Sequence, residues 1–362
     1  MQKTAIVCVT NDLSTDQRVH KTCMTLQKCG YWVKEYGRLL PDSLPLERSY
    51  FTIRKKLWFH KGPLFYSEFN IRLFIYLMTV NVDLIFSNDL DTLPAAYLAT
   101  KLRKKILIYD AHELFPELPE LVNRKFVKSI WEKIEELILP HLTNTITVCK
   151  SISEYYKNKY NIQMAVVRNI PIHLNHNESK PIIHYPDKKI ILYQGAINKG
   201  RGLEWVMDSM PFVSNAMLVI IGDGDILQEL VEKSKLLKIE DKVQFVGKIS
   251  GDKLFEYTPM ADIGLCILEN MGLNYYYALP NRIFDYLQAG VPVLATRFPE
   301  ITNIVEKFNT GILIDHYEPL YLAGVINDML DNPLNTEHFN SVSKELSWEK
   351  EEKVLMEVIN KS

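Results

Sequence analysis

Short apolar runs rich in β-branched residues alternate along the whole chain with segments of helical periodicity. The runs include "TAIVCVT", "KKILIYD", "KKIILYQG" and "AMLVIIGDGD", and helix-like stretches such as "TLPAAYLATKLR" lie between them. A strand that is apolar along its whole length is typical of a parallel sheet with helices on both faces. The alternation therefore predicts an α/β protein built on doubly wound parallel sheets.

The chain is long enough for two such sheets. It has 362 residues, and about six predicted strands lie on either side of the segment 168–189, which is rich in Pro, Asn and His. We interpret this segment as an interdomain linker. The pattern predicts an N-terminal domain over 1–170, a C-terminal domain over 171–340 and a final amphipathic helix within 341–362.

Composition excludes several classes of protein. The formal net charge is −2, whereas nucleic-acid-binding proteins are usually basic. The first residues enter a strand pattern without a cleavage-site context, and no apolar stretch reaches the ~18 residues of a membrane span. Three of the five cysteines (Cys8, Cys149 and Cys266) lie in apolar strand-like runs, as buried thiols of a reducing compartment do. We therefore expect a cytoplasmic protein that neither binds nucleic acid nor spans a membrane.

Two loops in the second half have the composition of a phosphate-binding site. In "LYQGAINKGRGLEWV", a predicted strand is followed by Gly195, Lys199 and Arg201 before a helix begins. Glycines let the backbone approach a ligand, and mobile cations suit a pyrophosphate. An ordinary turn with basic surface residues fits equally well. In "FVGKISGDKLFEY", Gly247 and Lys248 lie at another strand end, where they form either a base-contacting loop or a plain β–α loop.

The stretch "LPNRIFDYLQAGVPVLAT" predicts a loop, a short helix and a buried strand. Pro280 and Asn281 precede the helix, Arg282 lies in its first turn, and Asp285 follows one turn later on the same side. Arg282 could bind phosphate oxygens, and the Asp285 carboxylate could accept hydrogen bonds from two vicinal ribose hydroxyls. The alternative is a solvated Arg–Asp pair, worth only a few tenths of a kcal/mol.

Different chemistry is available at the strand ends of the first half. In "YDAHELFPE", His112 follows an apolar strand beside Glu113 and is either a catalytic group or a structural histidine. In "SNDLDTLP", Asp89 either caps the following helix, which suffices to explain it, or contacts a substrate hydroxyl. "NDLSTDQRVHK" brings Asp16 and Arg18 to the same rim, where Arg18 either steadies an anion or pairs with Asp16.

Taken together, these motifs resemble the family-4 glycosyltransferases. The resemblance rests on an ordered set of stretches over nearly the whole chain: "DQRVHKTCMTLQKCGYWV", "SNDLDTLPAAYLA", "YDAHE", "YQGAINKGRGLEWV", "IGDGD", "VQFVGK", "MADIGLCIL" and "LPNRIFDYLQAGVPVLAT". It implies the GT-B fold, in which two Rossmann-like doubly wound parallel-sheet domains face each other across a cleft. The C-terminal domain would hold the nucleotide sugar, and the final helix would cross back onto the N-terminal domain.

The resemblance also implies roles for single residues. Arg201 looks like the basic residue on the diphosphate, and Arg282 stands where a lysine is usual in the family. Asp285 matches the second of two glutamates separated by seven residues, the one that binds ribose. His112 looks like the N-terminal-domain histidine near the sugar and the acceptor.

One position departs from the family in a way that concerns the donor sugar. Tyr277 stands where the family has the first glutamate, the carboxylate near the donor sugar. We expect a backbone amide of "NMGLNYYYALPN" to hold the sugar instead, or Glu269 to serve from elsewhere. The sequence predicts neither the donor sugar nor the oligomeric state.

The implied activity is retaining transfer of a sugar from a nucleotide-diphosphate sugar to a hydroxyl acceptor, in bacterial-type surface glycan or polysaccharide synthesis. The departing phosphate would help to deprotonate the acceptor, so no metal and no cofactor are expected. A GT-B-fold sugar-nucleotide epimerase and a nucleotide-sugar-binding protein without turnover are the alternatives. The expected catalytic residues are His112, Arg201 and Arg282; the donor-binding residues Gly195, Lys199, Gly247, Lys248, Pro280, Asn281 and Asp285; and the acceptor-side candidates Asp16, Arg18, Asp89 and Glu113.

Membrane contact is a separate question that the segment 48–77 raises. The segment mixes basic residues with many aromatic ones. It fits an interfacial patch that serves a lipid-linked acceptor at the inner membrane face, and it also fits a strand plus a core helix with basic edges. The strand with a core helix is the slightly favoured interpretation. The expected acceptor is either a glycan or a lipid-linked molecule.

Overall fold

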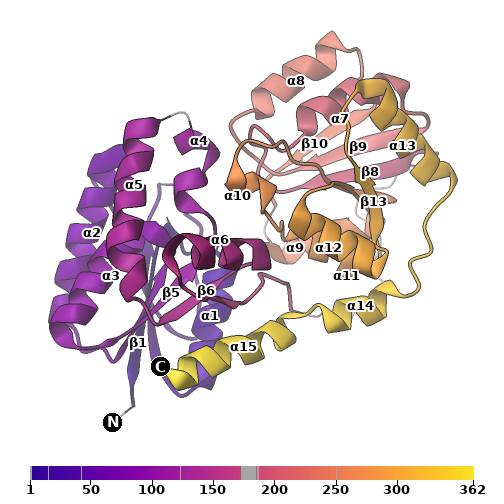
Figure 1. Ribbon diagram of the computed structural model, residues 1–362. Coiled ribbons are helices and arrows are strands. Elements are labelled where there is room, and N and C mark those ends of the chain that lie inside the picture. Colours follow the sequence, from indigo (N-terminus) through magenta and orange to yellow (C-terminus); the bar gives the residue numbers. More distant parts are fainter. Residues whose placement is uncertain are drawn as a thin grey trace. The chain divides into compact units, whose positions relative to one another are not determined.

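The computed structural model describes residues 2–14, 16–41, 43–122, 124–172, 185, 187–249 and 251–362. The chain divides into two compact units (Figure 1). Unit 1 comprises Met1–Asn169 together with Lys350–Ser362, and unit 2 comprises Ile170–Glu349. Most of the predicted linker 168–189 lies outside the described residues. The predicted C-terminal segment 341–362 is divided, since its residues up to Glu349 belong to unit 2.

Unit 1 is organised around a parallel sheet. Among the described residues this sheet has seven strands in the order β3-β2-β1-β4-β5-β6-β7. The strands are β1 (Thr4–Asp12), β2 (Trp32–Arg38), β3 (Phe51–Lys55), β4 (Leu84–Asn88), β5 (Ile106–Ala111), β6 (Asn144–Thr147) and β7 (Ala165–Val166). The α-helices before the unit boundary are α1 (Gln17–Lys28), α2 (Gly62–Thr79), α3 (Asp89–Arg103), α4 (Pro119–Val122), α5 (Lys125–Ile138) and α6 (Lys150–Tyr160). Helices α2, α3 and α5 lie on one side of the sheet (Figure 1).

Unit 2 repeats the same arrangement. Its sheet has six strands among the described residues, in the order β10-β9-β8-β11-β12-β13. The strands are β8 (Lys189–Gln194), β9 (Ala216–Ile221), β10 (Val243–Gly247), β11 (Ile263–Cys266), β12 (Val293–Thr296) and β13 (Gly311–Ile314). The α-helices are α7 (Leu203–Ser209), α8 (Leu227–Leu236), α9 (Gly251–Tyr257), α10 (Leu273–Tyr276), α11 (Arg282–Gln288), α12 (Pro299–Phe308), α13 (Pro319–Asp331) and α14 (Phe339–Glu345), and α15 (Trp348–Lys361) follows. The predicted α/β class with two doubly wound parallel sheets is confirmed.

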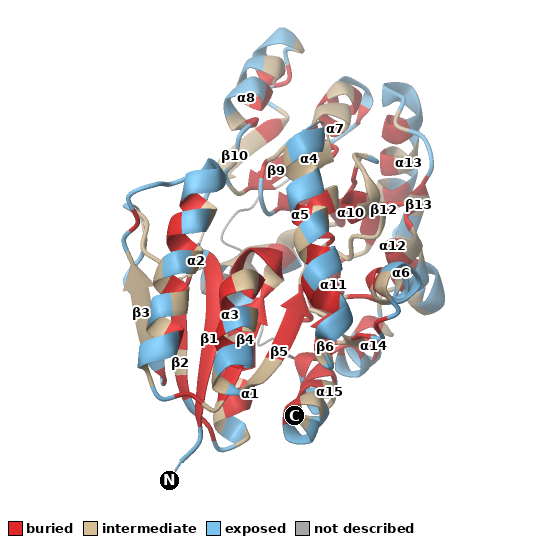
Figure 2. Cartoon of the chain, turned by 60° about the vertical axis from the view of Figure 1, so that its left-hand side comes forward, coloured by how far each residue is buried: buried red, intermediate tan, exposed pale blue. Residues whose placement is uncertain are grey.

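The strands are buried on both faces, as their continuous apolar runs require. In β8, Ile191 and Tyr193 belong to one apolar cluster with side chains of α7, α8 and α13. Ile190 and Leu192 point the other way, into a cluster with α11, α12 and α14. In unit 1, β1 and β4 are buried along most of their length (Figure 2). Each sheet is therefore the middle layer of a three-layer unit.

The strand order fixes where polar loops can gather. In each sheet the order reverses direction, between β1 and β4 in unit 1 and between β8 and β11 in unit 2. In open parallel sheets, ligands bind outside the carboxyl ends of the strands at such a reversal, because the flanking helices lie on opposite faces and leave a crevice. The crevices of the two sheets are therefore bordered by the loops after β1, β4, β5, β8 and β11.

The end of the chain belongs to unit 1. The backbone N–H of Arg168 and its guanidinium donate to the Glu351 carboxylate, with the shortest contact at 2.6 Å. The Glu352 carboxylate accepts from Lys28 Nζ at 2.8 Å and from Thr25 Oγ1 at 2.8 Å. These contacts tie α15 to α1 and to the strand end from which the chain leaves unit 1.

The segment 48–77 forms β3 and most of α2, so it contains the strand and helix of the second interpretation. Helix α2 packs into the core of unit 1 with a cluster that includes Phe65, Phe69, Leu73 and Leu77. None of the helices that the structure describes is both long enough and apolar enough for a membrane span.

Gly264 in β11 offers a test of how tightly unit 2 is packed. A methyl group added there would lie 2.4 Å from Cγ of Tyr286, whose ring is fully buried. We expect Gly264→Ala to lower the free energy of unfolding by about 1–3 kcal/mol, because the ring cannot move without a backbone shift. Gly324→Ala is the matched control: it lies in helix α13 with open space around it and should raise stability by up to about 1 kcal/mol. Urea denaturation measures both, and equal stability of the two variants would contradict the packing.

Candidate functional site

In unit 2, the loop after β8 packs closely against the ends of the neighbouring strands β9 and β11. The backbone oxygen of Gly195 lies so close to Gly222, at the end of β9, that a Cβ at Gly222 would be 1.8 Å from it. Gly202 has φ +74°, and a Cβ there would be 2.5 Å from Ile267 Cγ2, beyond the end of β11. The Glu269 N–H donates to Gly200 O at 2.9 Å. Only residues without side chains permit this packing, which fixes the loop at the reversal point of the sheet.

Two arginines lie around this loop with part of their hydrogen-bonding capacity unused. Arg282, at the start of α11, is 7% exposed, and its Cζ lies 4.4 Å from the ring centroid of Tyr193. A Cβ at Gly195 would be 3.4 Å from Arg282 Nη2, so the guanidinium lies against the loop backbone. Arg201 is half-buried, with its Cζ 4.9 Å from the Tyr275 ring centroid. Arg282 Nη1 and Arg201 Nε are buried and have no hydrogen-bond partner in the described part of the chain.

The two cations also act on one thiol. Burial raises the pKa of Cys266, at the end of β11, to about 11, while Arg282 and Arg201 both favour its charged form. Both guanidinium groups therefore lie close enough to the Cys266 thiol, at the end of β11, to influence its charge. Neither arginine has a carboxylate ion-pair partner within the residues described.

Asp285 lies one turn after Arg282 on α11. Its Oδ2 accepts a hydrogen bond from Gln194 Nε2 at 3.2 Å, and Gln194 Oε1 accepts from Thr258 Oγ1 at 2.9 Å. These two consecutive hydrogen bonds orient the half-buried carboxylate of Asp285 at the end of β8. Asp285 could be predicted as a site residue from the sequence. Gln194 and Thr258 could not, because nothing in their local spacing indicates that they orient Asp285.

The other predicted donor-side residues lie after β8, at the end of β10 and just before α11. Gly247 ends β10 with φ +84° and open space around it, and the backbone N–H of Gly222 donates to its oxygen at 2.9 Å. Lys199, Lys248 and Asn281 are exposed, and Pro280 is half-buried. Their side chains are free to reach a ligand in a way that the packed residues are not.

The aromatic stretch 275–277 forms α10 and its C-terminus. Tyr277 is half-buried, and its ring centroid lies 5.4 Å from that of Tyr276. Glu269 is also half-buried and is tied by its backbone to Gly200, next to Arg201. Glu269, one of the two expected replacements for the missing family carboxylate, thus lies on the loop after β11, which is hydrogen-bonded to the loop that carries Arg201.

In unit 1, His112 lies between two carboxylates at the end of β5. Its Nδ1 is 3.1 Å from Asp89 Oδ2, and its Nε2 is 3.2 Å from Asp110 Oδ2. The backbone N–H of His112 donates to Asp89 Oδ1 at 2.8 Å. Burial alone would lower the pKa of His112, but the charges of Asp89 and Asp110 outweigh it and raise the pKa well above its usual value. The two carboxylates therefore favour the charged, imidazolium form of His112.

Asp110 is in turn neutralised by Arg18. The guanidinium donates from Nε and Nη2 to the two carboxylate oxygens at 2.9 and 2.8 Å, and from Nη1 to Val167 O at 2.7 Å. Burial would raise the pKa of Asp110, yet Arg18 lowers it to about 2. Arg18 is only 4% exposed. Neither alternative considered for Arg18 holds: it pairs with Asp110 and not with Asp16, and its burial leaves it no surface on which to steady a free anion.

The remaining acceptor-side candidates have distinct local roles. Asp16 caps α1, since its side chain accepts from the backbone N–H of Val19 at 3.0 Å. Asp89 makes no side-chain cap for α3: it has φ +57° and turns its carboxylate to His112 instead. The capping interpretation of Asp89 is therefore wrong. Glu113 is half-buried in the loop after β5.

A further acid, Asp91, lies beside this cluster. Thr10 Oγ1 donates to its Oδ2 at 2.5 Å, and its Oδ1 is buried with no partner in the part of the chain described. Burial and the nearby Asp89 raise the pKa of Asp91 to about 7. Even so, no set of three or more His, Cys, Asp or Glu side chains suited to a metal ion occurs among the described residues.

Two family models match the chain, one for each half. The model described as "Glycosyltransferase Family 4" matches residues 17–173, and the model described as "Glycosyl transferases group 1" matches residues 175–346. Together the two matches run from α1 to the end of α14.

Curated proteins that resemble the chain do so over part of their length. An uncharacterized glycosyltransferase from Methanocaldococcus jannaschii is 26% identical over 40% of this chain and 37% of that protein. A chitobiosyldiphosphodolichol beta-mannosyltransferase from Candida albicans is 23% identical over 58% of this chain and 51% of that protein. The chain thus spans about half or less of the length of these relatives.

Solved structures match over the whole chain. A sucrose-phosphate synthase from Thermosynechococcus elongatus has a TM-score of 0.78 at 18% identity and covers 99% of both chains. The Anabaena protein HepE, solved in complex with UDP-glucose, has a TM-score of 0.72 at 12% identity and covers 99% of this chain and 100% of that chain. With its two parallel-sheet units, the chain has the GT-B fold.

The Arg18–Asp110 pair predicts a pH-dependent stability. A carboxyl group whose pKa is lowered in the folded state stabilises the protein above its ordinary pKa of about 4 and loses that contribution as the pH falls toward 2. Asp110→Asn leaves Arg18 buried without a counter-ion, so at neutral pH we expect a loss of about 3–5 kcal/mol in unfolding free energy. Asp315→Asn, in the exposed pair with Arg297, should change little. Urea denaturation between neutral pH and pH 2 tests this, and a difference from wild type that persists unchanged at pH 2 would contradict it.

The carboxylates of Asp89 and Asp110 on either side of His112 predict how its imidazole titrates. A raised pKa means that the charged imidazole stabilises the fold below about pH 6.5 and that this contribution is lost as the pH rises through the folded-state pKa. We expect NMR titration of labelled histidines to show the His112 imidazole charged at neutral pH, and Asp89→Asn to lower its pKa. Asp315→Asn should leave it unchanged. A His112 pKa at or below the ordinary value in the wild-type protein would contradict the charge stabilisation by Asp89 and Asp110.

Proposed function

Because both halves of the chain match glycosyltransferase family models, the chain belongs to the glycosyltransferases, and we propose that it uses a nucleotide-diphosphate sugar as the donor. The acceptor in this proposal is a hydroxyl group of a glycan or of a lipid-linked glycan, in surface glycan or polysaccharide synthesis. Transfer is proposed to proceed with retention at the anomeric carbon and without a metal or cofactor.

The observation that carries the proposal is the pair of uncompensated cations in unit 2. Arg282 is almost fully buried and Arg201 half-buried, and each has a buried guanidinium nitrogen with no partner among the described residues. A buried charge without a counter-ion costs several kcal/mol, so such a site favours an anionic ligand. Two guanidinium groups around a glycine loop match a diphosphate, since each presents planar donors to phosphate oxygens.

Asp285 supports a nucleoside rather than inorganic pyrophosphate as the ligand. Its carboxylate is oriented by Gln194 and lies on the same helix as Arg282. A carboxylate accepts hydrogen bonds from two vicinal hydroxyls at once, which is the arrangement of a ribose. The other groups that we assign to donor binding are Gly195, Lys199, Gly247, Lys248, Pro280 and Asn281.

In the proposed reaction, the bond between the anomeric carbon and the diphosphate oxygen breaks as the acceptor oxygen attacks from the same face. The acceptor proton passes to the departing phosphate, so no protein base is needed. Arg201 and Arg282 stabilise the charge that develops on the diphosphate. His112 is assigned to the sugar and acceptor side, where it acts through the positive charge of its ring, because both ring nitrogens face carboxylates. Asp89 and Asp110 are positioning residues for this ring, and Arg18 acts through Asp110. Asp16 and Glu113 remain our acceptor-side candidates.

The first experiment is donor hydrolysis by the purified chain without acceptor. A panel of UDP-, GDP- and ADP-sugars is incubated with and without EDTA, and released nucleotide is measured. We expect release from one donor, unaffected by EDTA. Arg282→Met should lower kcat/KM by roughly 100-fold, because the transition-state charge loses a buried donor. Asp285→Ala should mainly weaken donor binding. Arg297→Met, a surface arginine paired with Glu306 and Asp315, is the matched control and should behave as wild type.

Other outcomes assign other functions. A donor whose sugar changes configuration without release of nucleotide identifies the epimerase. The binding protein without turnover is identified if nucleotide binds and Arg282→Met abolishes this binding, while no donor is hydrolysed and no sugar is transferred to any acceptor in a panel of glycans and lipid-linked glycans. Tyr277, at the position of a family carboxylate, favours this alternative. Release abolished by EDTA contradicts the metal-free mechanism.

A further inference from the structure

Helix α2 carries large apolar side chains on two faces, yet only one of these faces is covered. Its inner face is buried in the core of unit 1 through Phe65, Phe69, Leu73 and Leu77. Its outer face carries large apolar side chains that are exposed: Leu64, Ile71, Ile75 and Met78. A helix that carries large apolar side chains on more than one face normally lies inside a protein or against a second apolar medium. The outer face of α2 is therefore an uncovered apolar surface.

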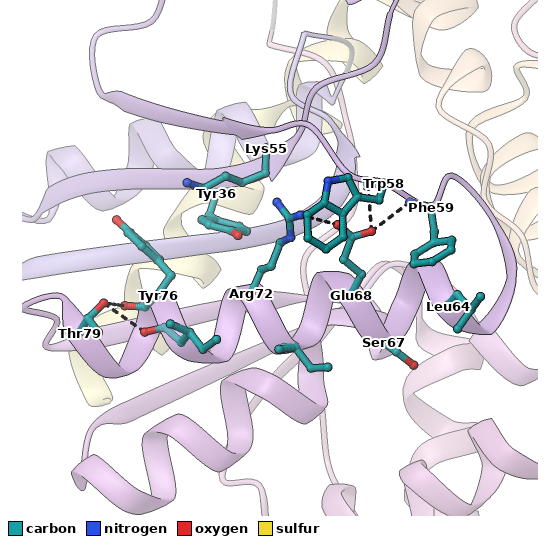
Figure 3. Close-up of a pocket in the computed structure, with 12 residues that line it drawn as sticks. Tyr36, Lys55, Trp58, Phe59, Leu64, Ser67, Glu68, Arg72, Tyr76 and Thr79 are labelled. Atoms are coloured by element: carbon teal, nitrogen blue, oxygen red, sulfur yellow. Dashed lines mark hydrogen bonds and ion pairs between the residues drawn. The ribbon is translucent and has the colours of Figure 1, made fainter.

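This face continues into a groove next to the chain that follows β3. The groove has a volume of about 710 Å³ and is lined by residues of α2, by Lys55 and by Trp58 and Phe59 (Figure 3). Trp58 is 80% exposed, an unusual position for the largest apolar side chain. We call this surface, consisting of Trp58, Phe59, Leu64, Ile71, Ile75 and Met78, the α2 face.

The groove is held in shape by Glu68 on α2. Its carboxylate accepts from the backbone N–H groups of Trp58 and Phe59 at 3.0 Å and forms an ion pair with Arg72 at 2.7 Å (Figure 3). The Arg72 guanidinium carbon lies 4.5 Å from the Trp58 ring centroid. These contacts fix Trp58 in its exposed position. They also neutralise Glu68, the one acidic residue between positions 48 and 79.

The charge around the α2 face is strongly positive. Residues 48–79 contain six Lys and Arg against that single Glu, although the whole chain has a net charge of −2. Arg54 and Arg72 are used in ion pairs with Asp12 and Glu68. Lys55, Lys56 and Lys61 have no ion-pair partner within the described residues, and Lys56 and Lys61 are exposed. Apolar side chains are thus bordered by cations whose charge is not compensated locally.

We propose that the α2 face docks on the surface of an anionic lipid bilayer, with Trp58 and Ile71 entering the headgroup boundary and Lys55, Lys56 and Lys61 contacting lipid phosphates. Exposed aromatic and aliphatic side chains next to basic ones are the combination that binds such interfaces, where burial of apolar area and attraction to anionic lipids add. A second protein copy with the same basic rim would repel it, which is why we choose the bilayer as the occupant. This contact is independent of donor binding in unit 2.

Cosedimentation of the full chain with phosphatidylcholine vesicles, with and without phosphatidylglycerol, tests the proposal. We expect binding that requires phosphatidylglycerol and weakens as salt rises, with a blue shift of tryptophan fluorescence. The double variant Trp58→Ser, Ile71→Ser should lower partitioning by roughly 10-fold or more, because two inserted apolar side chains are lost. Replacement of the three lysines by Gln should remove the dependence on phosphatidylglycerol.

The matched control is the double variant Leu236→Ser, Leu320→Ser, which removes two exposed apolar side chains of unit 2. It should bind vesicles as wild type does. Every variant is also assayed for donor hydrolysis in solution, which the α2 face does not serve, so a loss of fold is recognised separately. Absence of binding to anionic vesicles at low salt would overturn the proposal. So would binding that the Trp58, Ile71 variant leaves intact, or a dimer in solution that this variant abolishes.

Discussion

Parallel strands cannot be joined by tight turns, and the rest of this structure depends on that constraint. Each connection must return along the length of the sheet, usually as a helix, so all the carboxyl ends of the strands collect at one edge. The helices change face where the strand order reverses, after β1 and β4 in one unit and after β8 and β11 in the other. His112, Asp89, Arg201 and the glycine loop from Gly195 all occupy these edges, although they come from distant parts of the sequence.

The two units treat charge in opposite ways. At the strand ends around His112 in unit 1, cations and anions are paired within the protein, from Arg18 through Asp110 and His112 to Asp89. Such a network is rigid, because removing one member leaves another charge buried and unpaired. In unit 2, Arg282 and Arg201 have no such counterpart in the described part of the chain. The charges of Arg18, Asp110, His112 and Asp89 are thus paired with one another, whereas an anionic ligand would pair with Arg282 and Arg201.

Much of this architecture could be predicted from the sequence, because buried parallel strands leave an unmistakable pattern of continuous apolar runs. Strand-end residues such as His112 could be found in the same way, and the family resemblance added roles for Arg282 and Asp285. Contacts between distant residues could not be found. Arg18 lies two positions from Asp16 but pairs with Asp110, and Gln194 orients Asp285 across the sheet. Periodicity also marks α2 as apolar without showing that one of its faces is uncovered.

The last helix has a consequence for how the protein is made. Unit 2 is one continuous stretch of chain, whereas unit 1 needs Lys350–Ser362 in addition to the first 169 residues. The partners of Arg168 and Lys28 are Glu351 and Glu352, which follow unit 2 in the sequence and are therefore synthesised after it. On the ribosome, unit 2 therefore emerges whole while unit 1 is still incomplete, although synthesis of unit 1 begins first. The order of translation and the order of completion are reversed.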